Sequence, residues 1–319
     1  LDAAIDSYKK AIKVKADYAE AHNNLGVALN DKGNLGAAID SYKQALKIKP
    51  DYTEAYGNMG IALKGIKFNS PKTDLPEIII KLLDKKTYVR PSDIALSTIS
   101  LIKSGEAFQS VLSKYSTSDL EKTLKQAVTE LSEIPLLLKL MALCPISDPE
   151  IEQLLTYLRS AILNNVSQLS GSKETLAFQT ALALQCFTNE YIYTQTDEDT
   201  EILYDLENIV QINLANGQQP TPLTLACLAS YKGLNDHPWC HLLVLPDELK
   251  QLGKRQVSEV KKETVLRCEI PMLSEIKDAV SSKVRQQYEE NPYPRWISLG
   301  LPLTARPIVD IVKNLNLKV

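Results

Sequence analysis

The chain has 319 residues, a net charge of −3, 44% hydrophobic residues and 24% charged residues, which is ordinary for a globular protein. The slight negative charge excludes a nucleic-acid-binding surface as the main function, because such surfaces need clustered lysine and arginine. No apolar run approaches the roughly 20 residues that cross a bilayer, so we expect no membrane partner. Five scattered cysteines without a C-x-x-C pair indicate free thiols and a cytoplasmic location.

Residues 1–64 contain a repeat with a period of 34 residues, the offset between Leu1 and Leu35. The sequence LDAAIDSY at 1–8 recurs as LGAAIDSY, and AEAHNNLG at 19–26 recurs as TEAYGNMG at the same offset. Two matches at one offset indicate stacked helical hairpins, each of which buries its apolar stripe against the next. We therefore predict a partial α-solenoid, with a second helix, one full hairpin, and a first helix at 53–64.

The full copy resembles the tetratricopeptide pattern. Gly26 is small where two helices approach closely, and Gly33 lies in the turn between the helices, where a positive φ is favoured. The predicted packing stripe of the second helix is Ala38, Tyr42 and Ala45. Because Leu1 already lies inside a repeat and about three repeats are normally needed for stability, we expect further repeats upstream and a chain that is a fragment.

Asn24 and Asn58 occupy equivalent positions on the two first helices, as do Glu20 and Glu54. In the arrays of the O-linked N-acetylglucosamine transferases, which these repeats resemble, asparagines at that position form a ladder along an extended peptide. A carboxamide suits this role because it can donate to a backbone carbonyl and accept from a backbone N–H. We therefore predict a groove for a protein or extended peptide at these four residues and Asn23. Alternatively, Asn24 and Asn58 only cap or solvate the helix face.

Beyond the repeats, residues 65–76 contain two prolines and a glycine without helical spacing, which predicts a linker. Residues 77–285 keep helical amphipathicity, and no run alternates with a period of two, so we predict an all-α, multi-helix second domain. The largely apolar segment 174–193 is expected to be its central helix. Helix starts are predicted at residues 92–93, 118–119, 147–150, 196–200, 221–222, 247–248 and 274–275.

The sequence contains no complete catalytic or metal site. His237 and His241 enclose a cysteine within five residues, but Pro238 breaks helical pairing and no second ligand pair is nearby. We expect no metal there, and we expect Trp239 and Cys240 to fill the core at a helix junction. With three histidines in the whole chain, few general bases are present. We therefore predict that this chain is not itself an enzyme and binds no cofactor.

Residues 286–319 contain the sequence YEENPYPRW at 288–296. This composition predicts an extended segment with two aromatic anchors, in which an arginine pairs with an acid or stacks on a ring. The segment is either a rigid joint between domains or part of a substrate pocket. Its candidate residues are Tyr288, Glu289, Glu290, Asn291, Tyr293, Arg295 and Trp296.

This segment resembles a stretch in bacterial tetratricopeptide-repeat proteins fused to a class I S-adenosylmethionine-dependent methyltransferase, where it comes just before the methyltransferase fold. The sequences at 88–94 and 184–191 resemble the preceding helical region of those proteins. The resemblance implies that the chain recruits a protein substrate to a methyltransferase domain that starts near Val319, and that S-adenosylmethionine binds only in that domain. Alternatively, residues 288–296 contribute to the substrate pocket of the full-length enzyme, or the chain is a purely structural scaffold.

Overall fold

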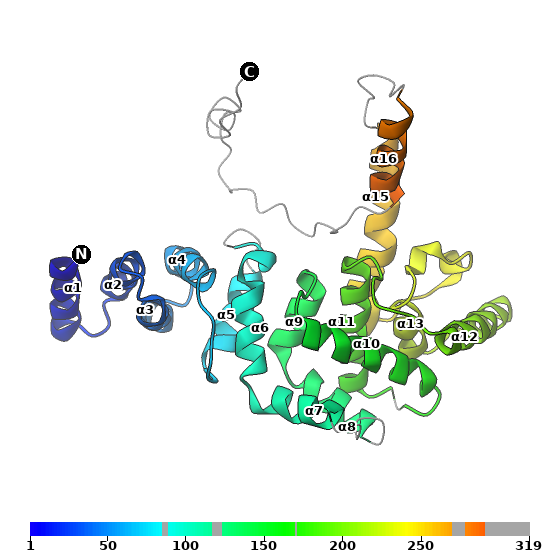
Figure 1. The fold of residues 1–319 in the computed structure, drawn as a ribbon, viewed down its shortest axis with the longest axis horizontal. Coiled ribbons are helices and arrows are strands. Elements are labelled where there is room, and N and C mark those ends of the chain that lie inside the picture. Colours follow the sequence, from blue (N-terminus) through cyan, green and yellow to red (C-terminus); the bar gives the residue numbers. More distant parts are fainter. Residues whose placement is uncertain (85–88, 117–122, 170, 270–277, 291–319) are drawn as a thin grey trace. The chain divides into compact units, whose positions relative to one another are not determined.

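The computed structural model describes residues 1–84, 89–116, 123–169, 171–269 and 278–290, with the backbone alone at 116, 279 and 287–290. These residues form helices joined by turns, and none of them forms a β-strand (Figure 1). The predicted all-α fold is confirmed for this part of the chain.

Contacts divide the chain into two compact units. The first contains Leu1–Ile66 and Lys81–Ile94, and the second contains Lys67–Ile80 and the described residues of Ala95–Ile297. The boundaries predicted from the sequence stay predictions.

The first unit begins with four helices, each packed against the next (Figure 1). They are α1 (Asp2–Val14), α2 (Ala19–Asp31), α3 (Leu35–Ile48) and α4 (Thr53–Leu63). Helix α2 also contacts α4, so the first helices of successive repeats lie against one another. This is the stacked arrangement that the repeat period predicts.

The close helix contact predicted at Gly26 is confirmed. A Cβ atom placed on Gly26 would lie 2.5 Å from the Tyr42 ring, a distance that no side chain tolerates. Tyr42 is buried with Ala38 and Ala45 along one stripe of α3. Gly33 has a φ of +80°, which ends α2 in the left-handed region that glycine adopts without strain.

The second unit is built around α11 (Lys173–Thr188), which packs against α8, α9, α13 and α14 (Figure 1). Every residue of α11 from Thr175 onward except Ala177 is buried, so the predicted central helix is confirmed. The helix ends at Thr188 rather than at Tyr193, because the next residues, Glu190 and Tyr191, both have a φ of 56°.

Eleven further α-helices, counting α8 and α9 among them, occur in the described residues. They are α5 (Leu75–Asp84), α6 (Ala95–Lys103), α7 (Glu106–Ser116), α8 (Leu124–Ser132), α9 (Pro135–Leu143), α10 (Pro149–Asn164), α12 (Asp197–Ala215), α13 (Pro222–Leu228), α14 (Lys250–Gly253), α15 (Glu259–Glu269) and α16 (Ala279–Glu290). None of the described helices combines the length and the apolar composition that a membrane crossing requires.

Several helix starts follow the predicted capping chemistry. Asp148 accepts a hydrogen bond from the backbone N–H of Ile151 at 3.1 Å, directly before α10. Thr196 and Asp199 form a reciprocal capping box at the start of α12. Side-chain oxygens at these positions satisfy backbone donors that have no partner within the helix.

Other predicted starts differ in detail. Residues 92–93 belong to a 3₁₀ turn, η1 (Pro91–Ile94), so α6 begins only after it. The start at 247–248 is also a 3₁₀ turn, η4 (Asp247–Leu249), which continues directly into α14. The starts predicted at 118–119 and 274–275 lie outside the described residues.

A π-helical turn, η5 (Lys254–Ser258), directs two consecutive polar side chains into the core of the second unit. Gln256 donates to the carbonyl oxygens of Ala183 at 3.3 Å and Ala229 at 3.0 Å, and it accepts from the N–H of Leu234 at 3.0 Å. Arg255 donates to a carbonyl oxygen on α9. The turn therefore connects α11, the end of α13 and α9 through buried hydrogen bonds.

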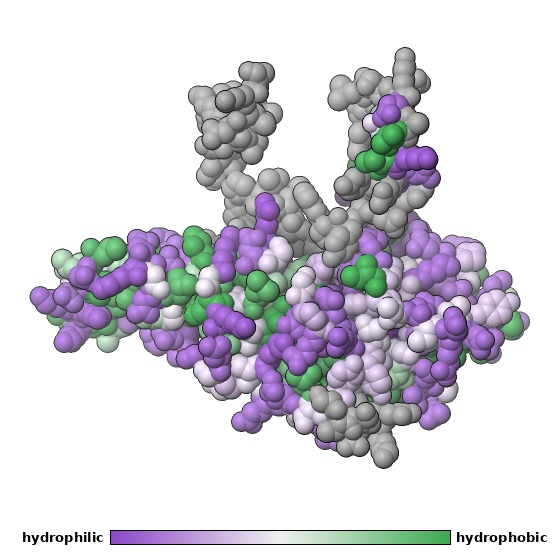
Figure 2. Space-filling model, in the orientation of Figure 1, coloured by the Kyte–Doolittle hydropathy of each residue, from purple (hydrophilic) through white to green (hydrophobic). Residues whose placement is uncertain are grey.

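Exposed apolar side chains occur in both units. On the face drawn in Figure 2, hydrophobic and hydrophilic residues are interspersed over the described surface. Val14 and Ile61 in the repeats, and Ile192 in the second unit, are among the exposed apolar residues.

The cysteines are free thiols, of which Cys268 is exposed.

Candidate functional site

The asparagines predicted to form a ladder lie together on the first helices of the repeats. Asn58 on α4 donates to Oδ1 of Asn23 on α2 at 3.1 Å. The Asn23 amide nitrogen lies 3.4 Å from both Oδ1 of Asn24 and Oε1 of Glu54. Asn23 is 0% exposed, whereas Asn24 and Asn58 are half-buried and Glu54 is exposed. Asn23 therefore bridges the two helices and orients the more exposed amides.

The side-chain amides of Asn24 and Asn58 can form further hydrogen bonds. Among the described residues, the side chain of Asn24 accepts one hydrogen bond and that of Asn58 donates one. A carboxamide can donate two hydrogen bonds and accept two. Each amide can therefore both donate to and accept from a further group, which is what a peptide backbone requires.

Glu20, the remaining residue of the predicted groove, does not join the asparagine cluster. Its carboxylate lies 3.8 Å from the ammonium of Lys49, which in turn lies 4.7 Å from the centroid of the Tyr52 ring. Burial raises the pKa of Tyr52, and the charges of Glu54 and Glu20 add to this effect. The charges of Glu20 and Glu54 thus both raise the pKa of the Tyr52 hydroxyl.

Sequence reasoning did not single out Lys49 and Tyr52. The signal was present, because Lys15 and Tyr18 precede α2 at the same spacing as Lys49 and Tyr52 precede α4. The Lys15 ammonium also lies over its tyrosine, 5.5 Å from the ring centroid. Comparison of the two interhelical turns, and not only of the helices, identifies this pair.

A second polar cluster lies in the core of the second unit and was also not predicted. Arg159 on α10 is 1% exposed. Its guanidinium donates to the carbonyl oxygens of Tyr193 at 3.0 Å, Thr194 at 2.7 Å and Ser230 at 3.4 Å. The guanidinium also lies 4.1 Å from the Tyr231 ring centroid. The signal in the sequence is a charged residue on the otherwise apolar stripe of α10.

The histidine-containing segment shows no metal-site geometry. His237 is buried and stacks on Trp239, with ring centroids 4.3 Å apart, while His241 is exposed. Among the described residues, no three His, Cys, Asp or Glu side chains gather as a metal site needs. Trp239 is buried as predicted. Cys240 is only half-buried, because it begins a surface 3₁₀ turn, η3 (Cys240–Leu242).

His237 is expected to make the stability of the second unit depend on pH. Burial lowers its pKa from 6.5 to about 4, and the charge of Lys232 adds to this effect. The Glu207 carboxylate lies 3.6 Å from Nδ1. Between pH 6.5 and 4 the unfolded state binds the proton and the folded state does not. The unfolding free energy therefore falls as the pH falls, by at most about 1.4 kcal/mol per pH unit.

The measurement for this expectation is chemical denaturation at several pH values, compared with His237→Phe. The phenyl ring keeps the stacking on Trp239 but does not titrate. Subtracting the two pH profiles removes the contribution of the carboxylates. Parallel profiles for the two proteins would contradict the expected role of His237.

Most of the residues predicted to form the aromatic joint lie outside the described residues. Residues 288–290 belong to the backbone of α16, and the others lie outside the described residues. These are Asn291, Tyr293, Arg295 and Trp296.

Comparison with known protein families identifies the repeats. The family model described as tetratricopeptide repeat matches residues 19–52, and a second, described as TPR repeat, matches residues 1–32. No curated protein matches the chain. The segment 19–52 has the length of the 34-residue period and contains both residues of the Gly26–Tyr42 contact. The chain therefore begins with tetratricopeptide repeats, a structure that typically binds proteins or peptides, and the repeats indicate a protein-interaction module.

Proposed function

We propose that the repeats bind an extended peptide of a partner protein, and that Asn24 and Asn58 contact the backbone of that peptide. The observation that carries this proposal is the amide cluster, in which buried Asn23 holds its neighbours in place. Because Asn23 orients these amides before binding, less conformational entropy is lost when a peptide is bound.

The alternative that these asparagines cap a helix has little support. Asn24 lies within α2 (Ala19–Asp31) and Asn58 within α4 (Thr53–Leu63), several residues from either helix end. Caps act at the first and last turns, where backbone groups lack partners. A solvated helix face remains as the competing interpretation, and the binding experiment distinguishes the two.

The double variant Asn24→Ala, Asn58→Ala is expected to weaken peptide binding roughly tenfold or more, since each lost hydrogen bond costs about 0.5–1.5 kcal/mol. The probe is a peptide selected on the wild-type protein from a random library, and its dissociation constant is measured by fluorescence anisotropy. Circular dichroism should show unchanged helicity. Gln44→Ala is the matched control, because it removes an exposed carboxamide from α3 and should leave affinity unaltered. Equal affinity for the wild type and the double variant refutes the proposed contacts of Asn24 and Asn58 with the peptide backbone.

The finer proposal is that this module recruits a protein substrate to an S-adenosylmethionine-dependent methyltransferase domain in the same polypeptide. The resemblance of residues 288–296 to the stretch that precedes such domains supports it. The coding sequence beyond Val319 tests it directly. A hydrophobic strand followed by a glycine-rich G-x-G-x-G loop is expected, and a different downstream sequence contradicts the proposal.

In this proposal the chain itself binds no S-adenosylmethionine. Calorimetric titration of residues 1–319 with the cofactor should show no binding, and tight binding refutes this part. The competing role, in which residues 288–296 line the substrate pocket, predicts that Tyr293→Ala and Arg295→Ala lower the activity of a full-length enzyme without unfolding it.

A further inference from the structure

The second unit contains an open hollow of about 470 Å³ that the peptide-binding proposal does not use. It lies between the C-terminal end of α7, the first turns of α10 and the segment that follows α11. The lining side chains that matter for its chemistry are Tyr115, Glu152, Tyr157, Ile192 and Tyr193.

Three tyrosines contribute to the lining of this hollow. Tyr115 on α7 and Tyr157 on α10 form a tilted pair with ring centroids 5.5 Å apart. Tyr193 is 7% exposed, and its hydroxyl is buried.

Contacts with Arg159 hold the segment after α11, which contains Ile192 and Tyr193, in place. Arg159 donates to the carbonyl oxygens of Tyr193 and Thr194, and the preceding residues Glu190 and Tyr191 keep the left-handed backbone conformation. Such strained residues persist only where surrounding contacts hold them. The hollow is therefore preformed, and Ile192 at its edge is 58% exposed.

Glu152 supplies a negative charge to the hollow. It is half-buried and forms no ion pair among the described residues. Burial raises its pKa, and the charge of Asp148 adds to the effect. Burial and nearby charges, including that of Glu152, also raise the pKa of Tyr193. The carboxylate thus acts electrostatically on the aromatic lining.

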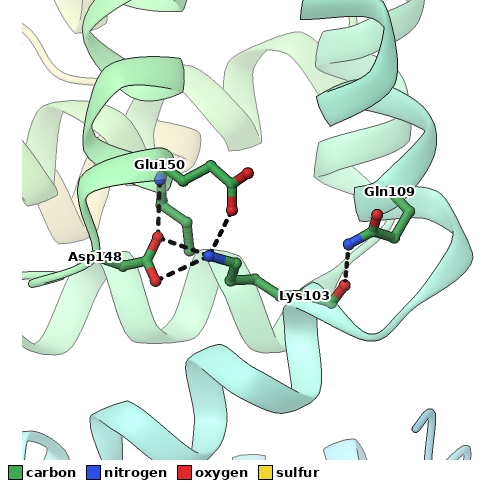
Figure 3. Close-up of polar contacts among 5 residues, drawn as sticks. Lys103, Gln109, Asp148 and Glu150 are labelled. Carbon is green, nitrogen blue, oxygen red and sulfur yellow. Dashed lines mark hydrogen bonds and ion pairs between the residues drawn. The ribbon is translucent and has the colours of Figure 1, made fainter. Parts of the chain in front are cut away.

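Two lysines of the second unit are already paired with carboxylates, and Arg159 donates to backbone carbonyl oxygens. Figure 3 shows Lys103 between two carboxylates, with its ammonium 3.0 Å from Asp148 Oδ2 and 2.6 Å from Glu150 Oε2. Although burial lowers the pKa of Lys103, its hydrogen bonds with Glu150 and Asp148 raise it overall. Lys114 on α7 pairs with Glu130 at 2.6 Å. Lys103 and Lys114 are thus paired with carboxylates other than that of Glu152.

We propose that this hollow binds an ammonium group, such as the side chain of a lysine on a partner protein. Tyrosine faces attract a cation through their quadrupole, and the half-buried carboxylate adds a direct charge interaction that is stronger away from water. A compact ammonium on a flexible apolar stem matches a hollow that has an exposed isoleucine at its edge and a carboxylate in its lining. The site lies within the second unit and does not depend on the peptide-binding role of the repeats.

The experiment is a calorimetric titration of the whole chain with a short glycine–serine peptide that carries one central lysine. The analogue with norleucine in place of lysine keeps the apolar stem and lacks the charge. Binding of the lysine peptide at least tenfold tighter than the norleucine peptide is expected, which corresponds to about 1.4 kcal/mol. Equal affinities, or no heat from the lysine peptide, overturn the proposal.

Two variants assign the binding to this hollow. Glu152→Gln keeps the shape of the side chain and should weaken lysine-peptide binding about fivefold to tenfold, whereas Glu150→Gln on the same helix turn should change it less than twofold. If Glu152→Gln disturbs folding, Tyr115→Leu is the second variant. We expect Tyr115→Leu to weaken lysine-peptide binding as well. Unchanged affinity in folded Glu152→Gln refutes the site.

Tetramethylammonium chloride separates the two sources of an ammonium group. Weaker binding of this salt than of the lysine peptide supports a lysine presented by a protein. Equal or tighter binding of the salt, lost in Glu152→Gln, supports a free small cation as the ligand of the same site.

Discussion

Replacing Arg159 by alanine is expected to lower the unfolding free energy of the second unit by about 3–5 kcal/mol. The substitution leaves the carbonyl oxygens of Tyr193, Thr194 and Ser230 without their donor. It also removes the guanidinium from the Tyr231 ring and leaves a cavity. The backbone that follows α11 then loses the contacts that oppose its left-handed residues.

Urea denaturation and amide hydrogen exchange in α10 and α11 measure this effect. Arg159→Lys should show an intermediate loss, because an ammonium replaces the charge but cannot reach three carbonyl oxygens with the geometry of a guanidinium. Lys125→Ala, which truncates an exposed residue of α8, should change the unfolding free energy by less than about 0.5 kcal/mol. A similarly small change in Arg159→Ala is incompatible with a structural role for the guanidinium.

Replacing Gly26 by valine is expected to destabilise the repeats by about 2–4 kcal/mol. Any Cβ atom at this position overlaps the ring of Tyr42. Tyr42 is 1% exposed, so its ring has no free space to occupy, and α2 must move away from α3. Helices α2 and α3 form the one full hairpin. Their separation therefore also weakens the packing of α4 on α2.

Gly57→Ala is the matched control, and it is expected to act in the opposite direction. Nothing lies within 4 Å of a Cβ atom placed on Gly57, which is in the interior of α4. Alanine there should stabilise the repeats by about 0.5–1 kcal/mol, because it restricts the unfolded chain without a clash. Thermal unfolding followed by circular dichroism compares the two variants. A destabilised Gly57→Ala, or a Gly26→Val as stable as the wild type, contradicts this account of the hairpin.

Much of the local structure was predictable from the sequence for physical reasons. In a repeat, each helix packs mainly on its neighbours in the chain, so the period of 34 residues between Leu1 and Leu35 carries the packing information. The contact of Gly26 with Tyr42 and the cap at Asp148 are likewise set by residues close in sequence. The termination of α11 was mispredicted, because an apolar pattern continues to Tyr193 while the backbone turns at Glu190.

By itself, the sequence determined the helical class, the repeat and the equivalence of Asn24 and Asn58. Only the tertiary structure decided that buried Asn23 joins the two repeats, and that Tyr115, Glu152 and Tyr193 line one hollow. The physical reason is that helical period and capping act within a few residues. The environment of a buried amide, guanidinium or carboxylate depends instead on which distant helices pack around it.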